Sequence, residues 1–141
     1  MRRLLTAGTL GVLGVLAFAG SARACSCAPM QPAEALRESD AAIVGRLVKV
    51  APRGVVQADY RYEVRRVYRG ARMIEAGQML SVRSARRSAA CALPRRIGRR
   101  YGLFLLRGEG HWRAGLCSVL SPRRLWAAAH GESRMYRRAA C

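Results

Sequence analysis

The sequence predicts an all-β fold of one domain, cross-linked by disulfides, with a short helix before the strands and another after them. Five short apolar segments are separated by turn residues, and no helical pattern alternates with them. Five cysteines indicate a disulfide framework with one thiol left over: Cys25, Cys27, Cys91, Cys117 and Cys141. The 141 residues fit one domain with a modest core.

The first 24 residues have the pattern of a secretory signal peptide. A basic start is followed by an apolar stretch over residues 4–20 and by the small residues Ala22 and Ala24. Cleavage after Ala24 would make Cys25 the N-terminus of a single domain, residues 25–141. Two alternatives stay open: a membrane anchor, for which the stretch is short and rich in Gly, and a lipid on Cys25, for which a Leu is usual where Ala22 stands. We expect a secreted protein, extracellular or periplasmic, with no membrane span after processing.

The predicted elements follow one another along the rest of the chain. A short helix is expected over residues 33–38, because Pro32 suits a first helical turn. A second helix is expected from Pro122 to about His130, and no element is predicted for the tail beyond it. Strands are expected over residues 41–50, 59–68, 78–83, 101–106 and 111–118.

The strand over residues 59–68 has the clearest alternation. Tyr60, Tyr62 and Val64 point to one face, and Val67 is one residue out of step with them. A β-bulge near Arg65-Arg66 would restore the phase.

Turn residues and connections separate the strands. Pro52-Arg53-Gly54 predicts a turn, and residues 84–98 form a long, Arg-rich connection. In the strand over residues 78–83, Met79 and Val82 are expected to face inward. Short strands in this number suggest a barrel or a sandwich, and the five-stranded OB barrel matches the strand count.

The chain is strongly basic. Its 26 Lys and Arg against 8 Asp and Glu give a net charge of +18, and loss of the leader, with three Arg and no acid, leaves +15. This charge favours anionic partners, although a solvated surface is the simpler interpretation.

Metal and catalytic sites within the chain are disfavoured. No Cys-x-x-Cys occurs, and His111 and His130 have no partners at ligand spacing, so structural zinc is a minor alternative to disulfides in an exported chain. No nucleophile and base fall into a recognisable arrangement, so we expect no enzyme activity and no cofactor.

Several short motifs occur in a fixed order over residues 25–120. They are Cys25-Ser26-Cys27-Ala28-Pro29, Glu34-Ala35-Leu36, Ser39-Asp40-Ala41-Ala42-Ile43-Val44-Gly45-Arg46, Tyr62-Glu63-Val64, Val67-Tyr68-Arg69-Gly70, Ser88-Ala89-Ala90-Cys91, Tyr101-Gly102-Leu103-Phe104 and Leu116-Cys117. In this order and spacing the chain resembles the N-terminal, netrin-like domain of the tissue inhibitors of metalloproteinases, as a minimal, bacterial-type member. The resemblance implies an OB barrel flanked by helices.

The same resemblance implies the disulfides Cys25–Cys91 and Cys27–Cys117, and it leaves Cys141 unpaired. From the spacing alone, four cysteines allow three connectivities. The family's third bridge starts on the first helix, where this chain has no cysteine, and the cysteine-rich C-terminal domain of the animal inhibitors is absent. Ala92 stands where the family usually has Gly.

The resemblance also implies a function. The α-amino and carbonyl groups of Cys25 would chelate the catalytic zinc of a target protease and displace the water that the enzyme activates. Ser26, next to Cys27, would point into a specificity pocket, and Ser88, Ala89 and Ala90 would lie beside it. The expected function is therefore a secreted inhibitor of a zinc metalloprotease.

A binding module without inhibitory activity is the second hypothesis. OB barrels bind oligosaccharides and nucleic acids on one face. Such a module would bind anionic polysaccharide, nucleic acid or a membrane surface through a basic face with stacking aromatics. The candidate residues are Arg61, Arg65 and Arg83 with Tyr60, Tyr62 and Tyr68, whose tyrosines also have the pattern of a core.

Overall fold

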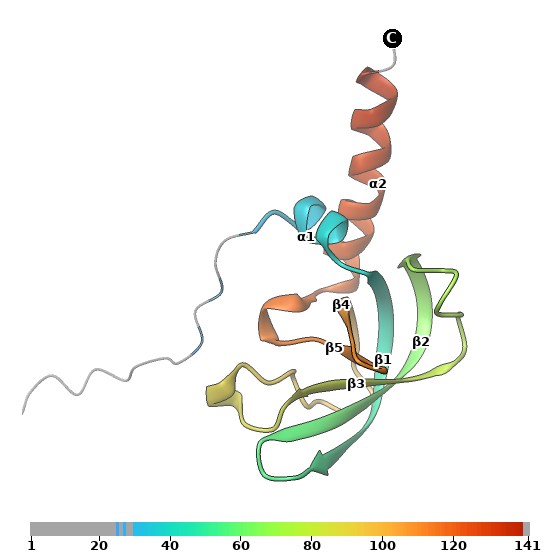
Figure 1. Cartoon of the computed structure of the whole chain (residues 1–141). Coiled ribbons are helices and arrows are strands. Elements are labelled where there is room, and N and C mark those ends of the chain that lie inside the picture. The colour runs from blue at the N-terminus through green and yellow to red at the C-terminus, as the bar shows by residue number, and fades with distance from the viewer. Residues whose placement is uncertain (1–24, 26, 28–29, 140–141) are drawn as a thin grey trace, which may run out of the picture.

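The computed structural model describes Cys25, Cys27 and residues 30–139, without the side chains of residues 132–139. The predicted leader, residues 1–24, lies outside the described residues. In chain order the elements are α1 (Pro32–Glu38), β1 (Ala41–Arg53), β2 (Gln57–Arg69), β3 (Met79–Ala85), the 3-10 helix η1 (Ser88–Ala90), β4 (Arg100–Gly108), β5 (His111–Arg113), the 3-10 helix η2 (Leu116–Ser118), β6 (Val119–Leu120) and α2 (Pro122–Ala139). Figure 1 shows both α-helices at one end of the strands, with α2 extending beyond them.

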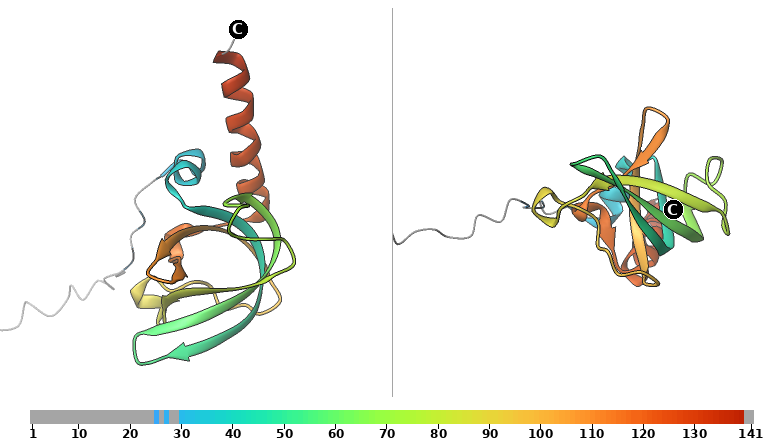
Figure 2. Two further views of the ribbon diagram at one scale, coloured as in Figure 1. Left: turned by 45° about the vertical axis from the view of Figure 1, so that its right-hand side comes forward. Right: turned by 90° about the horizontal axis from the view of Figure 1, so that it is seen from below.

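Five of the strands form a closed sheet. β1 pairs with β2, β2 with β3, β3 with β5 and β5 with β4, and β4 pairs back with β1. Among these described strands, only β3 and β5 pair in parallel. The short strand β6 pairs with β4 on the edge that faces away from β1. Figure 2 shows the sheet curving round on itself. The prediction of a mostly β chain with two flanking helices is confirmed.

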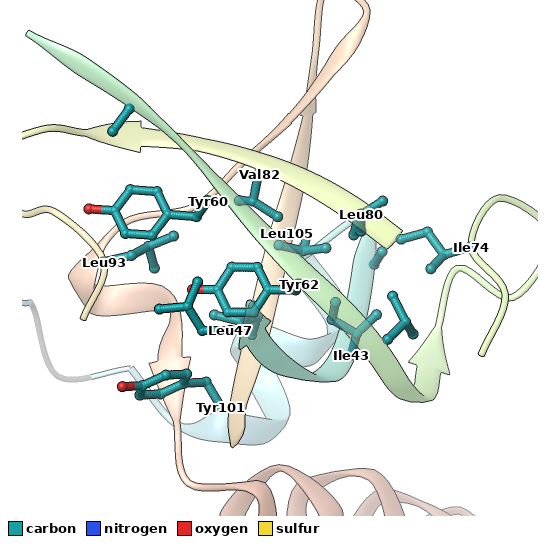
Figure 3. Packing of buried hydrophobic residues seen from close by; sticks show 14 residues of the cluster. Ile43, Leu47, Tyr60, Tyr62, Ile74, Leu80, Val82, Leu93, Tyr101 and Leu105 are labelled. Carbon is teal, nitrogen blue, oxygen red and sulfur yellow. The ribbon is translucent and has the colours of Figure 1, made fainter. Parts of the chain in front are cut away.

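The interior of the closed sheet holds the main hydrophobic core. Tyr60, Tyr62 and Val64 are fully buried there, as the alternation on β2 predicts. Figure 3 shows the side chains of Tyr60 and Tyr62 packed among residues of β1, β3 and β4. Leu93 and Ile74, which lie in connections rather than in strands, complete this core.

The predicted bulge in β2 is confirmed. Val44 of β1 lies opposite Arg66 and Gly45 lies opposite Val64, so Arg65 has no partner in the ladder. The extra residue shifts the inward–outward alternation of side chains by one position, so Val67 packs against the core again.

On β3 the predicted inward position of Met79 is wrong, and that of Val82 is correct. Met79 is 54% exposed because its partner in the ladder, Glu63, faces outward. Leu80, Val82 and Ser84 are the buried residues of this strand. Met79 and Val82 are three residues apart, so in a regular strand their side chains point to opposite faces and cannot both face inward.

The predicted ends of the first strand and of the second helix also differ from the structure. β1 continues through Pro52 to Arg53, which pairs with Gln57, so the hairpin turn begins only at Gly54. α2 does not end near His130 but continues to Ala139.

The last predicted strand, residues 111–118, is interrupted. Only His111–Arg113 forms β5, and the chain then leaves the ladder because the Leu116 N–H donates to the Cys91 carbonyl (2.9 Å). Strand pairing resumes in β6.

A second, smaller core lies between the sheet and the helices. Leu36 of α1, Phe104 of β4 and Leu125 of α2 are buried against one another. Gly102 permits this contact, since a Cβ at that position would lie 3.0 Å from the Cβ of Leu125. The helices therefore close one end of the sheet.

Two buried tyrosines provide a matched stability test. The hydroxyl of Tyr62 is buried with no partner among the described protein atoms, and burial raises the pKa of Tyr62 above its usual value. The hydroxyl of Tyr60 donates to the Ala85 carbonyl (3.3 Å) and accepts from Arg95 Nε (3.4 Å). Tyr62→Phe should leave the free energy of unfolding unchanged or raise it, whereas Tyr60→Phe should lower it by about 1 kcal/mol. Urea denaturation measures both, and a larger loss for Tyr62→Phe would contradict the assignment.

Candidate functional site

Two disulfides join the N-terminal segment to the body of the protein. Cys25 is bonded to Cys91 and Cys27 to Cys117, with Cα–Cα distances of 5.5 and 5.4 Å. These are the pairs that the resemblance implies. Ser26 lies between the bonded cysteines but outside the described residues, as does Cys141.

A tight turn presents Cys91 to the N-terminal segment. The Ala90 N–H donates to the Arg87 carbonyl (3.0 Å) and the Cys91 N–H to the Ser88 carbonyl (3.1 Å), which closes η1. Cys91 then adopts φ 61°, the only positive φ of a non-glycine residue in the described part of the chain. A residue held in this region is strained, and the turn is retained here by the disulfide and the backbone hydrogen bonds.

The turn and the first cysteine form one exposed ridge. Ser88, Ala89 and Ala90 are all exposed. Cys25 Sγ lies 3.4 Å from the Ala89 carbonyl oxygen and 3.7 Å from that of Ser88. A disulfide sulfur has no proton to donate, so these are packing contacts. In Figure 1 and Figure 2 the yellow turn of η1 lies at the side of the sheet, away from α2.

The second bridge is tied to the first through the backbone. The Leu116 N–H donates to the Cys91 carbonyl, and Gly115 passes so close that a Cβ there would lie 3.4 Å from the same oxygen. Cys91 and Cys117 are therefore on neighbouring segments. Since Cys25 and Cys27 are bonded to them, both ends of the short N-terminal segment are fixed to one rigid region.

An open depression of about 740 Å³ borders this ridge, and arginines dominate its polar side. The side chain of Arg86 donates to the Gly54 carbonyl (3.2 Å), and Arg95 donates to the Arg86 carbonyl and to the Tyr60 hydroxyl. Neither arginine, nor Arg87 beside them, forms an ion pair with a described carboxylate. The ridge is therefore flanked by uncompensated positive charge.

Of the aromatic residues considered for the second hypothesis, Tyr60 and Tyr62 belong to the core, as their pattern also indicates, and Tyr68 is partly exposed. Tyr60 and Tyr62 have no exposed surface, so they cannot stack on a base or a sugar. Arg83 lies close to Asp59, with 3.8 Å between Nε and Oδ1, so its charge is compensated.

No metal site or membrane-spanning helix is found in the described part of the chain. No three of its His, Cys, Asp and Glu side chains are grouped so that they could hold a metal ion. Among the same residues, none of the helices has the length and apolar character needed to cross a bilayer.

The bridge between Cys27 and Cys117 closes a loop with a sequence separation of 90 residues. Replacing both cysteines by Ser should lower the free energy of unfolding by about 4 kcal/mol, because the unfolded chain gains the entropy that the bridge removed. The matched double variant of Cys25 and Cys91, with a separation of 66, should lose nearly the same amount, since closure entropy depends weakly on loop length. Chemical denaturation tests this, and a loss below about 1 kcal/mol in either variant would contradict it.

Comparison with known proteins bears on what this ridge is for. A family profile described as "Tissue inhibitor of metalloproteinase" matches residues 23–139, which is most of the chain. No curated protein matches the sequence. The match includes the bridged cysteines, η1 and the whole closed sheet. The chain therefore belongs to the tissue inhibitor of metalloproteinase family.

Proposed function

We propose that the protein is exported, is cleaved after Ala24, and inhibits a zinc metalloprotease with its new N-terminus. The α-amino and carbonyl groups of Cys25 would bind the catalytic zinc of the target. The observation that carries this proposal is the rigid attachment of Cys25 to the exposed turn at Ser88–Ala90. Family membership supports inhibition of metalloproteinases in general.

The chemistry of the terminus suits the role. A free α-amino group has a pKa of about 7.7–8.0, so zinc can displace its proton near neutral pH. Amine and carbonyl of one residue form a chelate, which would occupy the position of the water that a zinc protease activates. Without that water the target cannot hydrolyse a peptide bond.

Rigidity supports tight binding. A free N-terminal segment would lose conformational entropy on entering an active site, at a cost of about 0.5–1.5 kcal/mol for each side chain that becomes fixed. Here two disulfides and the hydrogen bond from Leu116 to Cys91 order Cys25 and Cys27 before binding. Ser26 would enter the specificity pocket next to the zinc, and Ala89 and Ala90 would widen the contact.

Export is supported by the cysteines and by the extent of the family match. Two disulfides need an oxidising compartment, such as the periplasm or the exterior of a cell. The family match begins at residue 23, close to the proposed cleavage site. The proposed location is therefore extracellular or periplasmic.

We further propose that the closed sheet is an OB-type barrel. Its strand order, β1-β2-β3-β5-β4 with β4 returning to β1, joins five strands into one ring. Its interior is filled by side chains, as in other small barrels.

Blocking the α-amino group is the most direct test of inhibition. Acetylation of Cys25, or one additional Ala before it, should abolish inhibition of a susceptible zinc protease, because the chelating amine is lost. The melting temperature should stay unchanged, since the amine is not part of the core. Inhibition assays over a panel of zinc proteases, with intact mass to verify processing, provide the measurement.

The same variants separate the two hypotheses. A binding module would be retained on heparin in a salt-sensitive way, and blocking the terminus would not alter its retention. If the correctly processed protein leaves every protease of the panel active, the inhibitor proposal fails.

A substitution on the ridge tests the contact surface. Ala89→Glu should weaken inhibition about 30-fold or more, because a bulky charged side chain would have to lose its hydration against the target. Ala76→Glu provides the matched control, since Ala76 is equally exposed but lies in the loop between β2 and β3. Inhibition constants for both variants are the measurement, and equal effects would show that Ala89 lies outside the interface.

A further inference from the structure

A second cationic site lies away from the N-terminal ridge, where β2 meets α2. It is an open depression of about 470 Å³. Its lining includes three arginines and two aromatic residues: Val44, Arg65, Arg66, Tyr68, Arg100, Pro122 and Trp126. None of these residues belongs to the ridge or to its flanking depression. Figure 1 shows the end of β2 near the first turns of α2.

The bulge in β2 creates the cationic wall. Arg65 is the unpaired residue of the bulge, and both Arg65 and Arg66 are exposed although they are consecutive. In a regular strand one of them would point into the core. Arg100 reaches the same depression from the start of β4. The bulge and the start of β4 together therefore bring three arginines to one depression.

Of the three arginines in the depression, only Arg65 is paired with a described carboxylate, that of Glu63. Glu63 Oε2 accepts from Arg46 Nη2 (2.6 Å) and from Arg65 Nη2 (2.9 Å). The hydrogen bond from Arg46, with the charge of Arg65, lowers the pKa of Glu63. Neither Arg66 nor Arg100 has an ion pair with any carboxylate in the described part of the chain. The depression therefore has an excess of positive charge. A bound anion would reduce the repulsion between its arginine side chains.

The opposite wall is aromatic and ordered. Trp126 is 46% exposed, and its ring stacks on His130 with 4.4 Å between centroids and 24° between planes. Tyr68 meets the same imidazole edge-on, with centroids 6.2 Å apart. The His130 ring is further fixed by the 2.8 Å contact of Nδ1 with the Trp126 carbonyl. A rigid indole surface therefore faces the depression.

A phosphate ester fits both walls. A phosphomonoester has a charge of about −1.5 to −2 at pH 7 and three acceptor oxygens, whereas a carboxylate or a sulfate ester offers a single charge. Arginine forks bind such oxygens in pairs. We propose that this depression binds a phosphate ester, with the phosphate against Arg65, Arg66 and Arg100 and a planar or apolar body against Trp126. The ester could be a soluble metabolite or the headgroup of a lipid.

Calorimetric titration of the processed protein with phenyl phosphate tests the site. The double variant Arg66→Gln/Arg100→Gln should bind at least about tenfold more weakly, because charge-assisted hydrogen bonds are lost. The control Arg61→Gln/Arg72→Gln removes the same charge from exposed positions outside the depression and should change binding less than about twofold. Trp126→Leu should weaken binding of phenyl phosphate but not of inorganic phosphate.

A vesicle assay distinguishes the two sources of the ester. Vesicles of phosphatidylcholine with about one-fifth phosphatidic acid test the lipid source. Binding to them that is lost in the Arg66/Arg100 variant and kept in the control would assign the site to lipid. Binding of phenyl phosphate without such vesicle binding would assign it to a soluble ester. The proposal is overturned if neither phenyl phosphate nor these vesicles bind, or if the control variant loses as much affinity as the test variant.

Discussion

The double pairing of β1 is the constraint on which the rest of the structure depends. Residues 41–46 pair with β4 on one side and with β2 on the other, so the sheet closes instead of ending in two free edges. Gly45 makes this possible, because a Cβ there would lie 3.0 Å from that of Tyr62 across the ladder. Closure encloses the main core and places β4 where α1 and α2 can cover it. Both proposed sites lie on the outside of this closed sheet.

The two disulfides extend that rigidity to Cys25 and Cys27. No described strand pairs with either of these two residues, so their position comes from the bridges to Cys91 and Cys117. Those two positions are held in turn by the hydrogen bond between Leu116 and Cys91 and by the buried side chain of Leu93. The position of Cys25 and Cys27 therefore depends on the fold around Cys91 and Cys117, because each bridge holds one of the two residues.

Alternation and turn residues predict the strands well. The features that they do not predict, a core residue in a connection and a break in the last strand, come from contacts between distant segments. On β2 the buried Tyr60 and Tyr62 follow from period two, and the bulge follows from the misplaced Val67. Ile74 lies in a connection, where no periodicity marks it as core, and the last strand is broken by a hydrogen bond to a residue far away in the sequence. The resemblance supplied the cysteine pairs. The arginine depression joins β2, β4 and α2, and no local pattern indicates that these three elements meet.

The two proposed sites depend on different titrations, and this makes them separable in one molecule. Zinc chelation needs the neutral α-amine, so it should weaken as the pH falls below its pKa of about 7.7–8.0. Arginine does not titrate in this range, and a phosphomonoester, whose second pKa is about 6, keeps at least half of its second charge down to about pH 6. Glu63, whose pKa is lowered, stays ionised over the same interval and keeps Arg46 and Arg65 in place. Mild acidification should thus weaken zinc binding by Cys25 while the arginine depression still binds its anion.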